Sequence, residues 1–178
     1  MKTRKILLLL ILTLNLISCK GIAQEKGTIE TTTVSDCSKD DVNFPEPIGY
    51  VNDFERIFTS DQKNQLEKII SEFEEQTTKE ISIVTISSIE PYDDIGHYAA
   101  DLAQHWGVGK SDSNNGLLII FSQPLREIFI ATGLGTEKIL TDDICKSVID
   151  EIIIPEFRDG EFYTGIEKGV RVLISKWK

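Results

Sequence analysis

The sequence has few of the residues that most often identify a chemical site. Its 178 residues include three cysteines, two histidines and one methionine. The cysteines form neither a Cys-x-x-Cys pair nor a Cys/His cluster, so no zinc site is indicated. No Ser-His-Asp or Cys-His nucleophile arrangement is recognisable from a local pattern. A triad made of residues far apart in the sequence would produce no such local pattern. The residue types therefore give no direct support to nucleophilic catalysis.

Basic residues are also scarce. The chain has 19 Lys and Arg against 29 Asp and Glu, a formal charge of −10. Proteins that bind phosphate backbones or anionic headgroups need clustered Lys and Arg, so the composition argues against nucleic acid and anionic membrane surfaces as partners. Cations or basic partners suit this surface better.

No apolar run is long enough to span a bilayer. The longest, residues 6–17, follows a basic start and ends at Leu16-Ile17-Ser18-Cys19, which is typical of a secretory signal. The closing tetrapeptide resembles the lipobox of bacterial lipoproteins and implies acylation of Cys19. We therefore expect a signal peptide over 1–18 and a lipid on Cys19 that holds the protein to a membrane. Cleavage removes three basic and no acidic residues, which takes the formal charge from −10 to −13.

The remaining chain is predicted to hold one domain. Residues 19–47 are polar and read as a flexible tether, and residues 48–178 have the alternating pattern of a globular domain. Cys37 lies in the tether and Cys145 on an apolar helix face. A buried free thiol is favoured at Cys145, and pairing with Cys37 stays open.

The hydrophobic pattern predicts helices that alternate with short apolar strands. Thr59 and Gln62 form a capping-box pattern before a helix that runs to about Thr77. The other predicted segments are an extended stretch over 50–58, strands over 81–86, 117–121 and 126–131, and helices over 93–106, from about 141, and over 161–177. This order predicts a three-layer α/β/α sandwich with a small, mixed, mostly parallel central sheet.

Two conspicuous sequence patterns give only weak evidence for a binding site. Gly109-Lys110-Ser111 ends like a P-loop, but Gln104 stands where the first glycine belongs, and the loop lies between a helix and a strand in the wrong order. His97, Asp101 and His105 share one helix face, yet the polar face of an amphipathic helix often produces such spacing. We expect neither a nucleotide site nor a metal site from them.

Oxygen-bearing side chains in the loops are more suggestive. If the last two strands are antiparallel, the loop over 107–116 and the loop over 133–143 lie at one edge of the sheet. The extended segment before Thr59 is long enough to bring Asp53 to that edge as well. We expect convergence of oxygen donors suited to a hard cation, namely Asp53, Asn114, Asn115, Glu137, Asp142 and Asp143.

The order of these motifs resembles the TPM domain family, named for a thylakoid lumen protein, a photosystem II accessory protein and an acetylcholine-receptor modulator. The motifs are Val51-x-Asp53, Trp106-Gly107-Val108-Gly109, Asn114-Asn115-Gly116, Gly133-Leu134-Gly135-x-Glu137, Leu140-Thr141-Asp142, Pro155-x-Phe157 and Gly165. The resemblance implies an α/β/α sandwich, an extracytoplasmic location and divalent cation binding, notably of Ca²⁺. It also implies a weak acid phosphatase activity, known in a plant member.

Two functional hypotheses follow. The first is a monomeric, lipid-anchored binding module of the bacterial cell envelope that takes up a divalent cation and serves assembly or maintenance of an unidentified envelope protein. The second is a metal-assisted acid phosphatase in which an Asp acts as base or nucleophile. The acidic charge opposes an anionic substrate, and shared fold is a poor guide to activity, so binding is favoured over catalysis.

Overall fold

The computed structural model describes residues 42–177. The signal peptide, Cys19 and Cys37 lie outside this range, so the predictions about them stay predictions. Within residues 42–177 no helix is long and apolar enough to cross a bilayer.

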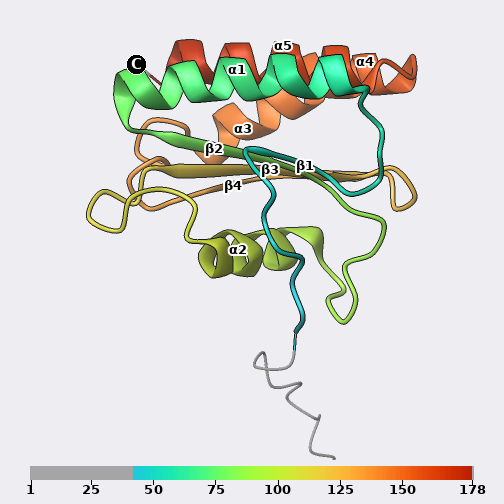
Figure 1. Ribbon diagram of the computed structural model, residues 1–178, viewed down its shortest axis with the longest axis horizontal. Helices are drawn as coiled ribbons and strands as arrows, with labels where there is room; N and C mark the ends of the chain where they lie inside the picture. Colours follow the sequence, from blue (N-terminus) through green and yellow to red (C-terminus); the bar gives the residue numbers. More distant parts are fainter. Residues whose placement is uncertain (1–41, 178) are drawn as a thin grey trace, which may run out of the picture. The chain divides into compact units, whose positions relative to one another are not determined.

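Four strands and several helices make up the described domain (Figure 1). In chain order they are β1 (Val51–Asp53), α1 (Ser60–Thr77), β2 (Glu80–Thr85), α2 (Ile95–Trp106), β3 (Gly116–Ser122), β4 (Glu127–Thr132), α3 (Asp142–Val148), the π-helical segment η2 (Ile149–Ile153), α4 (Ile154–Arg158) and α5 (Phe162–Lys176). Pro155 lies within the first turn of α4. The helical path therefore continues past this proline, which the sequence pattern had placed between two separate helices.

The strands form one sheet in the order β1-β2-β3-β4. The β1–β2 and β2–β3 pairs are parallel and the β3–β4 pair is antiparallel, which confirms the predicted mixed, mostly parallel sheet. The connections β1-α1-β2 and β2-α2-β3 step across the sheet in one direction, with their helices on opposite faces (Figure 1). The two crossovers therefore have opposite hands, so one departs from the usual right-handed rule.

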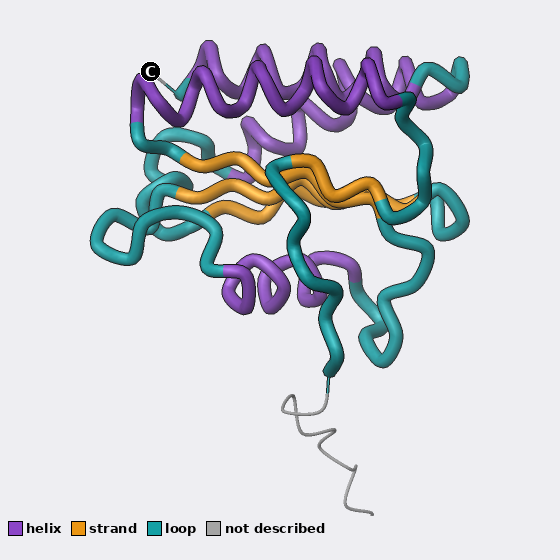
Figure 2. Tube along the Cα trace, viewed as in Figure 1, coloured by secondary structure: helices purple, strands orange, loops and turns teal. Residues whose placement is uncertain are grey.

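Helices cover both faces of the sheet, as Figure 2 shows. Ile81, Ile83 and Ile119 belong to the core beneath α1, α3 and α5, whereas Val84, Leu118 and Ile120 pack with α2 on the other face. Every residue of β3 is buried. A strand covered on both faces needs a continuous apolar run, which is what residues 117–121 supply. The predicted α/β/α sandwich is confirmed.

The start of the domain differs from the predicted tether. Phe44 lies with its ring centroid 5.3 Å from that of Tyr98, and Trp106 Nε1 donates a hydrogen bond to the Pro45 carbonyl at 2.8 Å. Residues 44 and 45 therefore contact α2, although composition assigned residues 19–47 to a tether. Polar composition hid this contact because it is made by one aromatic side chain and one carbonyl.

Candidate functional site

The loop over 107–115 and the loop over 133–141 meet at the edge of the sheet where β3 begins. Gly135 N donates to the Asn114 carbonyl at 3.0 Å, and the Thr136 hydroxyl donates to the Gly116 carbonyl at 2.9 Å. A Cβ atom on Gly135 would lie 2.0 Å from the Ser113 carbonyl oxygen. The glycine is thus required for close backbone approach, and the predicted meeting of these loops is confirmed.

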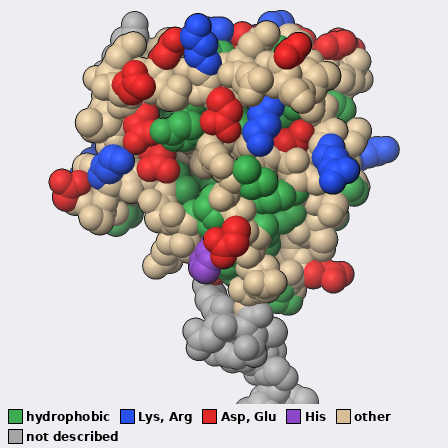
Figure 3. All heavy atoms as spheres, viewed as in Figure 1, with side chains coloured by type: hydrophobic (Ala, Val, Ile, Leu, Met, Phe, Trp, Pro, Cys, Tyr) green, Lys and Arg blue, Asp and Glu red, His purple; other side chains and the backbone are tan. Residues whose placement is uncertain are grey.

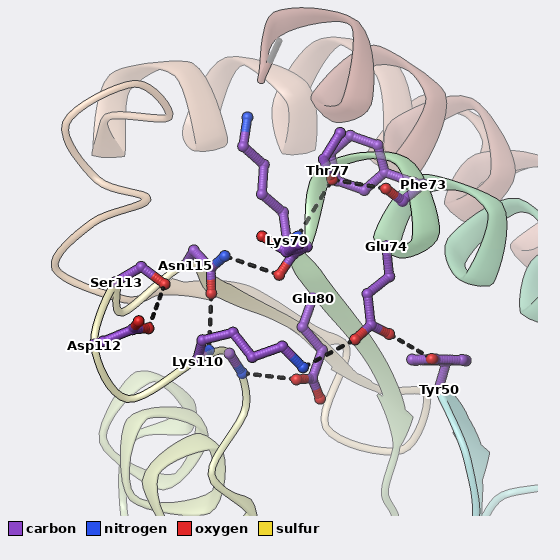
Figure 4. A network of polar contacts seen from close by, with 12 residues as sticks. Tyr50, Phe73, Glu74, Thr77, Lys79, Glu80, Lys110, Asp112, Ser113 and Asn115 are labelled. Carbon is purple, nitrogen blue, oxygen red and sulfur yellow. Dashed lines mark hydrogen bonds and ion pairs between the residues drawn. The ribbon is translucent and has the colours of Figure 1, made fainter.

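Asn115 holds its own loop against the start of β2. Its Oδ1 accepts from Lys110 N at 2.8 Å, and its Nδ2 donates to the Thr78 carbonyl at 2.8 Å (Figure 4). Both ends of the amide are therefore used by backbone partners. Asn114 adopts a left-handed φ of 47°, a conformation that Asn tolerates better than most residues. Asn115 thus has a structural role at this edge.

Glu74, near the end of α1, joins the same edge to β1. Its carboxylate accepts hydrogen bonds from the Tyr50 hydroxyl and, at 3.1 Å, from Lys110 Nζ (Figure 4). The hydrogen bond to Tyr50 is the main cause that lowers the pKa of Glu74, and Lys110 adds to it. In return this contact raises the pKa of Tyr50 to about 12. Lys110 of the rejected P-loop pattern therefore serves as an ion-pair partner.

Asp53 does not join this edge. It ends β1 and pairs in register with Thr85 at the end of β2, whereas Gly116 pairs with Glu80 at the start of β2. Asp53 therefore lies at the opposite end of the strands from the two loops. The expectation was wrong because β1 stops at Asp53 instead of extending to residue 58. The carboxylate itself ends the strand, since it accepts hydrogen bonds from Ile57 N at 3.0 Å and Phe58 N at 2.8 Å.

The remaining predicted ligands are exposed. Glu137 lies in the second loop, and Asp142 and Asp143 occupy the first turn of α3, where acidic side chains also complement the helix dipole. Asp142 and Asp143 line a cavity of about 450 Å³ beside β4. Across residues 42–177 no three His, Cys, Asp or Glu side chains are grouped so as to hold a metal ion. The six predicted donors therefore do not form one preassembled cage.

The histidine pattern on α2 has other contacts. His97 Nδ1 lies 3.7 Å from Asp94 Oδ1, and Asp101 accepts a hydrogen bond from the Tyr92 hydroxyl at 2.8 Å. The ring of His105 lies 5.3 Å from that of Phe44. These side chains support the packing of α2 and the segment before β1.

Sequence reasoning missed a large cavity of the described domain. It measures about 580 Å³ and lies at the carboxyl end of β3, between the β3–β4 turn and α4 and α5. Phe121, Phe157 and Phe162 supply aromatic walls, and Arg126 and Arg158 lie at its rim. Only the rule that ligands bind beyond the carboxyl ends of parallel strands could have suggested it, because its residues are far apart in the sequence.

The surface visible in Figure 3 carries both positive and negative charges, without a large area of one sign. Figure 3 shows acidic and basic side chains interspersed over the helical layer, with hydrophobic side chains gathered lower on the same face. Local arrangement of charges, more than net charge, therefore decides which ligands a given part of this surface attracts.

Comparisons with known proteins agree with this fold. The N-terminal domain of a protein from P. gingivalis, solved by NMR, is 28% identical with a TM-score of 0.65, covering 71% of this chain and 80% of that one. The BA42 protein from Bizionia argentinensis is 20% identical with a TM-score of 0.60, covering 70% of this chain and 88% of that one. An N-terminal domain from Corynebacterium glutamicum is 16% identical with a TM-score of 0.58, covering 77% and 86%. None of the curated proteins matches the sequence.

The family comparison covers the whole sandwich. A family model described as the TPM domain matches residues 51–176, from the first residue of β1 to the last of α5. The match includes both meeting loops and the residues of the 580 Å³ cavity. By this match and by its fold, the chain belongs to the TPM domain family.

Proposed function

We propose that this protein is a lipid-anchored, extracytoplasmic TPM-domain protein that acts by binding, with the edge formed by residues 107–116 and 133–143 as its cation-responsive surface. A divalent cation such as Ca²⁺ binds there and supports assembly or maintenance of envelope proteins. The observation that carries the proposal is the hydrogen-bonded contact between the two loops, the second of which leads into α3 with the exposed carboxylates of Asp142 and Asp143 in its first turn.

Hard cations prefer oxygen ligands, and carboxylates at a fixed edge can share a cation with water. Asp142 and Asp143 are the strongest donors there, with Glu137 in the adjoining loop. Because the described residues contain no preassembled carboxylate cage, we expect weak binding of the kind found in extracellular modules, with a dissociation constant of roughly 10⁻⁴–10⁻³ M. Asp53 contributes nothing, since its carboxylate serves the turn after β1.

A metal-assisted phosphatase remains the second candidate, because the matching family model carries the name TPM phosphatase. The distribution of carboxylates opposes the version in which Asp53 and Asp142 share one site, since they lie at opposite edges of the sheet. Turnover of p-nitrophenyl phosphate that is lost in Asp142→Asn/Asp143→Asn but retained in Asp61→Asn, an exposed carboxylate in the first turn of α1, would favour catalysis over binding alone. Equal turnover in both variants would exclude Asp142 and Asp143 from the reaction.

The anchor and the cation response are tested together in intact cells. Metabolic labelling with an alkyne fatty acid should mark the wild-type protein and leave Cys19→Ala unlabelled and released from membranes. Cross-linking in envelopes should then give a Ca²⁺-dependent pattern that EGTA and Asp142→Asn/Asp143→Asn both abolish, with Asp61→Asn as the matched control. The proposal would be contradicted if the cross-linking pattern were identical in wild type with Ca²⁺, wild type with EGTA and both variants.

A further inference from the structure

The outer edge of β4 is open within the described domain. β4 is the last strand of the sheet, and its only strand partner is β3. Gly133 N bonds to the Gly116 carbonyl, and in an antiparallel pair every second residue bonds to the partner strand. Phe129 and Ala131 therefore bond to β3, whereas the backbone groups of Ile128, Ile130 and Thr132 point outward.

A groove runs along this edge. The 580 Å³ cavity lies beside the start of β4 and the 450 Å³ cavity beside its middle, and Ile128 lines both. Aromatic and aliphatic side chains of η2, α4 and α5 form the far wall, chiefly Ile149, Ile154, Phe157 and Phe162. Outward backbone donors and acceptors beside two apolar recesses are the features that bind an added strand, with alternate side chains entering the recesses.

The two ends of the groove differ in charge. Arg126 and Arg158 lie at the end where β4 begins, and neither has an ion-pair partner among residues 42–177. Asp142 and Asp143 line the second recess, farther along β4, where Lys146 is already paired with Asp150 at 2.7 Å. Glu127 also lines the 580 Å³ cavity, so the two arginines and this one carboxylate leave a net positive charge there. One end is therefore cationic and the other anionic.

We infer that this groove binds an extended peptide as a fifth strand antiparallel to β4, with the carboxyl end of the peptide at Arg126 and Arg158 and basic residues at Asp142 and Asp143. The direction follows from charge complementarity, because β4 runs from the arginines toward the acidic pair. Apolar side chains at alternate peptide positions fill the two recesses. This inference goes beyond the proposed cation-binding function, because a cation on Asp142 and Asp143 would compete with the basic residues of the peptide.

A second copy of the chain fits the groove less well. Pairing of two β4 strands would also bring opposite charges together, but the side chains that should enter the recesses would be Ile128 and Ile130 of the other copy. Ile130 is only 6% exposed because it is packed in its own core, and Ile128 packs against the same core. The recesses would stay unfilled, whereas a free peptide has side chains available to fill them.

The test uses the folded protein in EDTA, so that cation binding does not enter. The probes are fluorescein-labelled peptides Lys-Lys-X-Thr-X-Thr-Phe with a free carboxyl end, where X is Val, Ile, Leu or Phe. We expect at least one to bind, and binding to weaken at least about tenfold when its carboxyl end is amidated or in Arg126→Gln/Arg158→Gln, as for loss of a charged hydrogen bond. Lys68→Gln/Lys176→Gln has the same charge change at two residues that line neither recess, and this variant should bind normally.

Hydrogen exchange locates the peptide. At saturation the outward amides of Ile128, Ile130 and Thr132 should gain protection, whereas those of Phe129 and Ala131 are protected with or without peptide. Failure of every probe to bind, or binding without protection of the three outward amides, would overturn the inference. Concentration-dependent protection without peptide, accompanied by a dimer in sedimentation, would overturn it in favour of a second copy. None of these results depends on Ca²⁺, so failure here is distinct from failure of the proposed cation site.

Discussion

The Thr85 hydroxyl donates a hydrogen bond to Asp53 Oδ1 at 2.7 Å, and this contact joins the carboxyl ends of β1 and β2. The same carboxylate accepts from the backbone amides of Ile57 and Phe58. Asp53 therefore connects two strands and the turn that leads to α1. Its place in the family pattern is explained by folding, without any bound ligand.

Replacement of this carboxylate should reduce stability. Asp53→Asn keeps one acceptor oxygen and loses the second, which leaves a backbone amide of the turn poorly paired, so we expect a loss of about 1–3 kcal/mol in the free energy of unfolding. Urea unfolding at pH 7 measures it as a lower midpoint with an unchanged slope. The exposed Asp112→Asn is the control and should change stability by less than about 0.5 kcal/mol. Equal losses in the two variants would contradict the structural role.

The Tyr50–Glu74 contact gives a pH dependence. The hydrogen bond to Glu74 raises the pKa of Tyr50 from 10.0 to about 12. Since the folded value is the higher one, the contact contributes stability that is fully present below pH 10 and is lost as pH rises through about 12. In Glu74→Gln, ¹³C NMR titration should return the Tyr50 pKa toward 10. A Tyr50 pKa that stays near 12 in this variant would show that another group is responsible.

At acid pH the same contact makes stability depend on pH in the opposite direction. Tyr50 and Lys110 hold the pKa of Glu74 below its usual value of 4.5. The resulting stability is present above that value and is lost as pH falls through the folded-state pKa. Tyr50→Phe should move the Glu74 pKa upward, as followed by NMR of its carboxyl carbon, while Lys68→Met on the exposed face of α1 leaves it unchanged. No movement in Tyr50→Phe would assign the shift to Lys110 alone.

The contact between the loops should be sensitive to a single methyl group. Gly135→Ala places a Cβ against the Ser113 carbonyl oxygen, 2.0 Å away in the present backbone, so the loops must separate at a cost of about 1–3 kcal/mol. Gly107→Asn is the matched control, because Gly107 has a left-handed φ of 68° with open space around it and Asn tolerates that conformation. Thermal unfolding measures both. A Gly135→Ala protein as stable as the control would contradict the contact.

Cys145 should be unreactive in the folded protein. The thiol is free and 5% exposed, and burial raises its pKa to about 11. Because the thiolate is the reactive form, a Cys37→Ser protein lacking Cys19 should react with Ellman's reagent at pH 8 only as fast as it unfolds. Urea above the unfolding midpoint should accelerate the reaction to the rate of a free thiol. Rapid labelling under native conditions would contradict burial of Cys145.

Local sequence patterns predicted the elements well, because each depends on neighbouring residues. Thr59 and Gln62 form the capping box expected before α1, and the apolar run over 117–121 forms the buried strand β3. The meeting of the loops near Asn114 and Gly135 was also predictable, since it follows from one antiparallel pair.

Features that depend on distant residues were harder to predict. Asp53 was misplaced because its pattern does not reveal that its own carboxylate ends the strand. Arg126 and Arg158 were missed because a turn and a helix more than 30 residues apart bring them to one cavity. No local spacing in the sequence indicates that these two residues line the same cavity.

The most direct test of the proposed cation-binding edge is a Ca²⁺ titration of the ¹⁵N-labelled domain, residues 42–178, once its fold has been verified by its amide spectrum. We predict saturable shifts, in the range of roughly 10⁻⁴–10⁻³ M, at Asn114, Glu137, Asp142 and Asp143, with Asp53 and Thr85 silent. Asp142→Asn/Asp143→Asn should abolish these shifts and Asp53→Asn should retain them. Shifts centred on Asp53, or no saturable shift at any residue, would contradict the account.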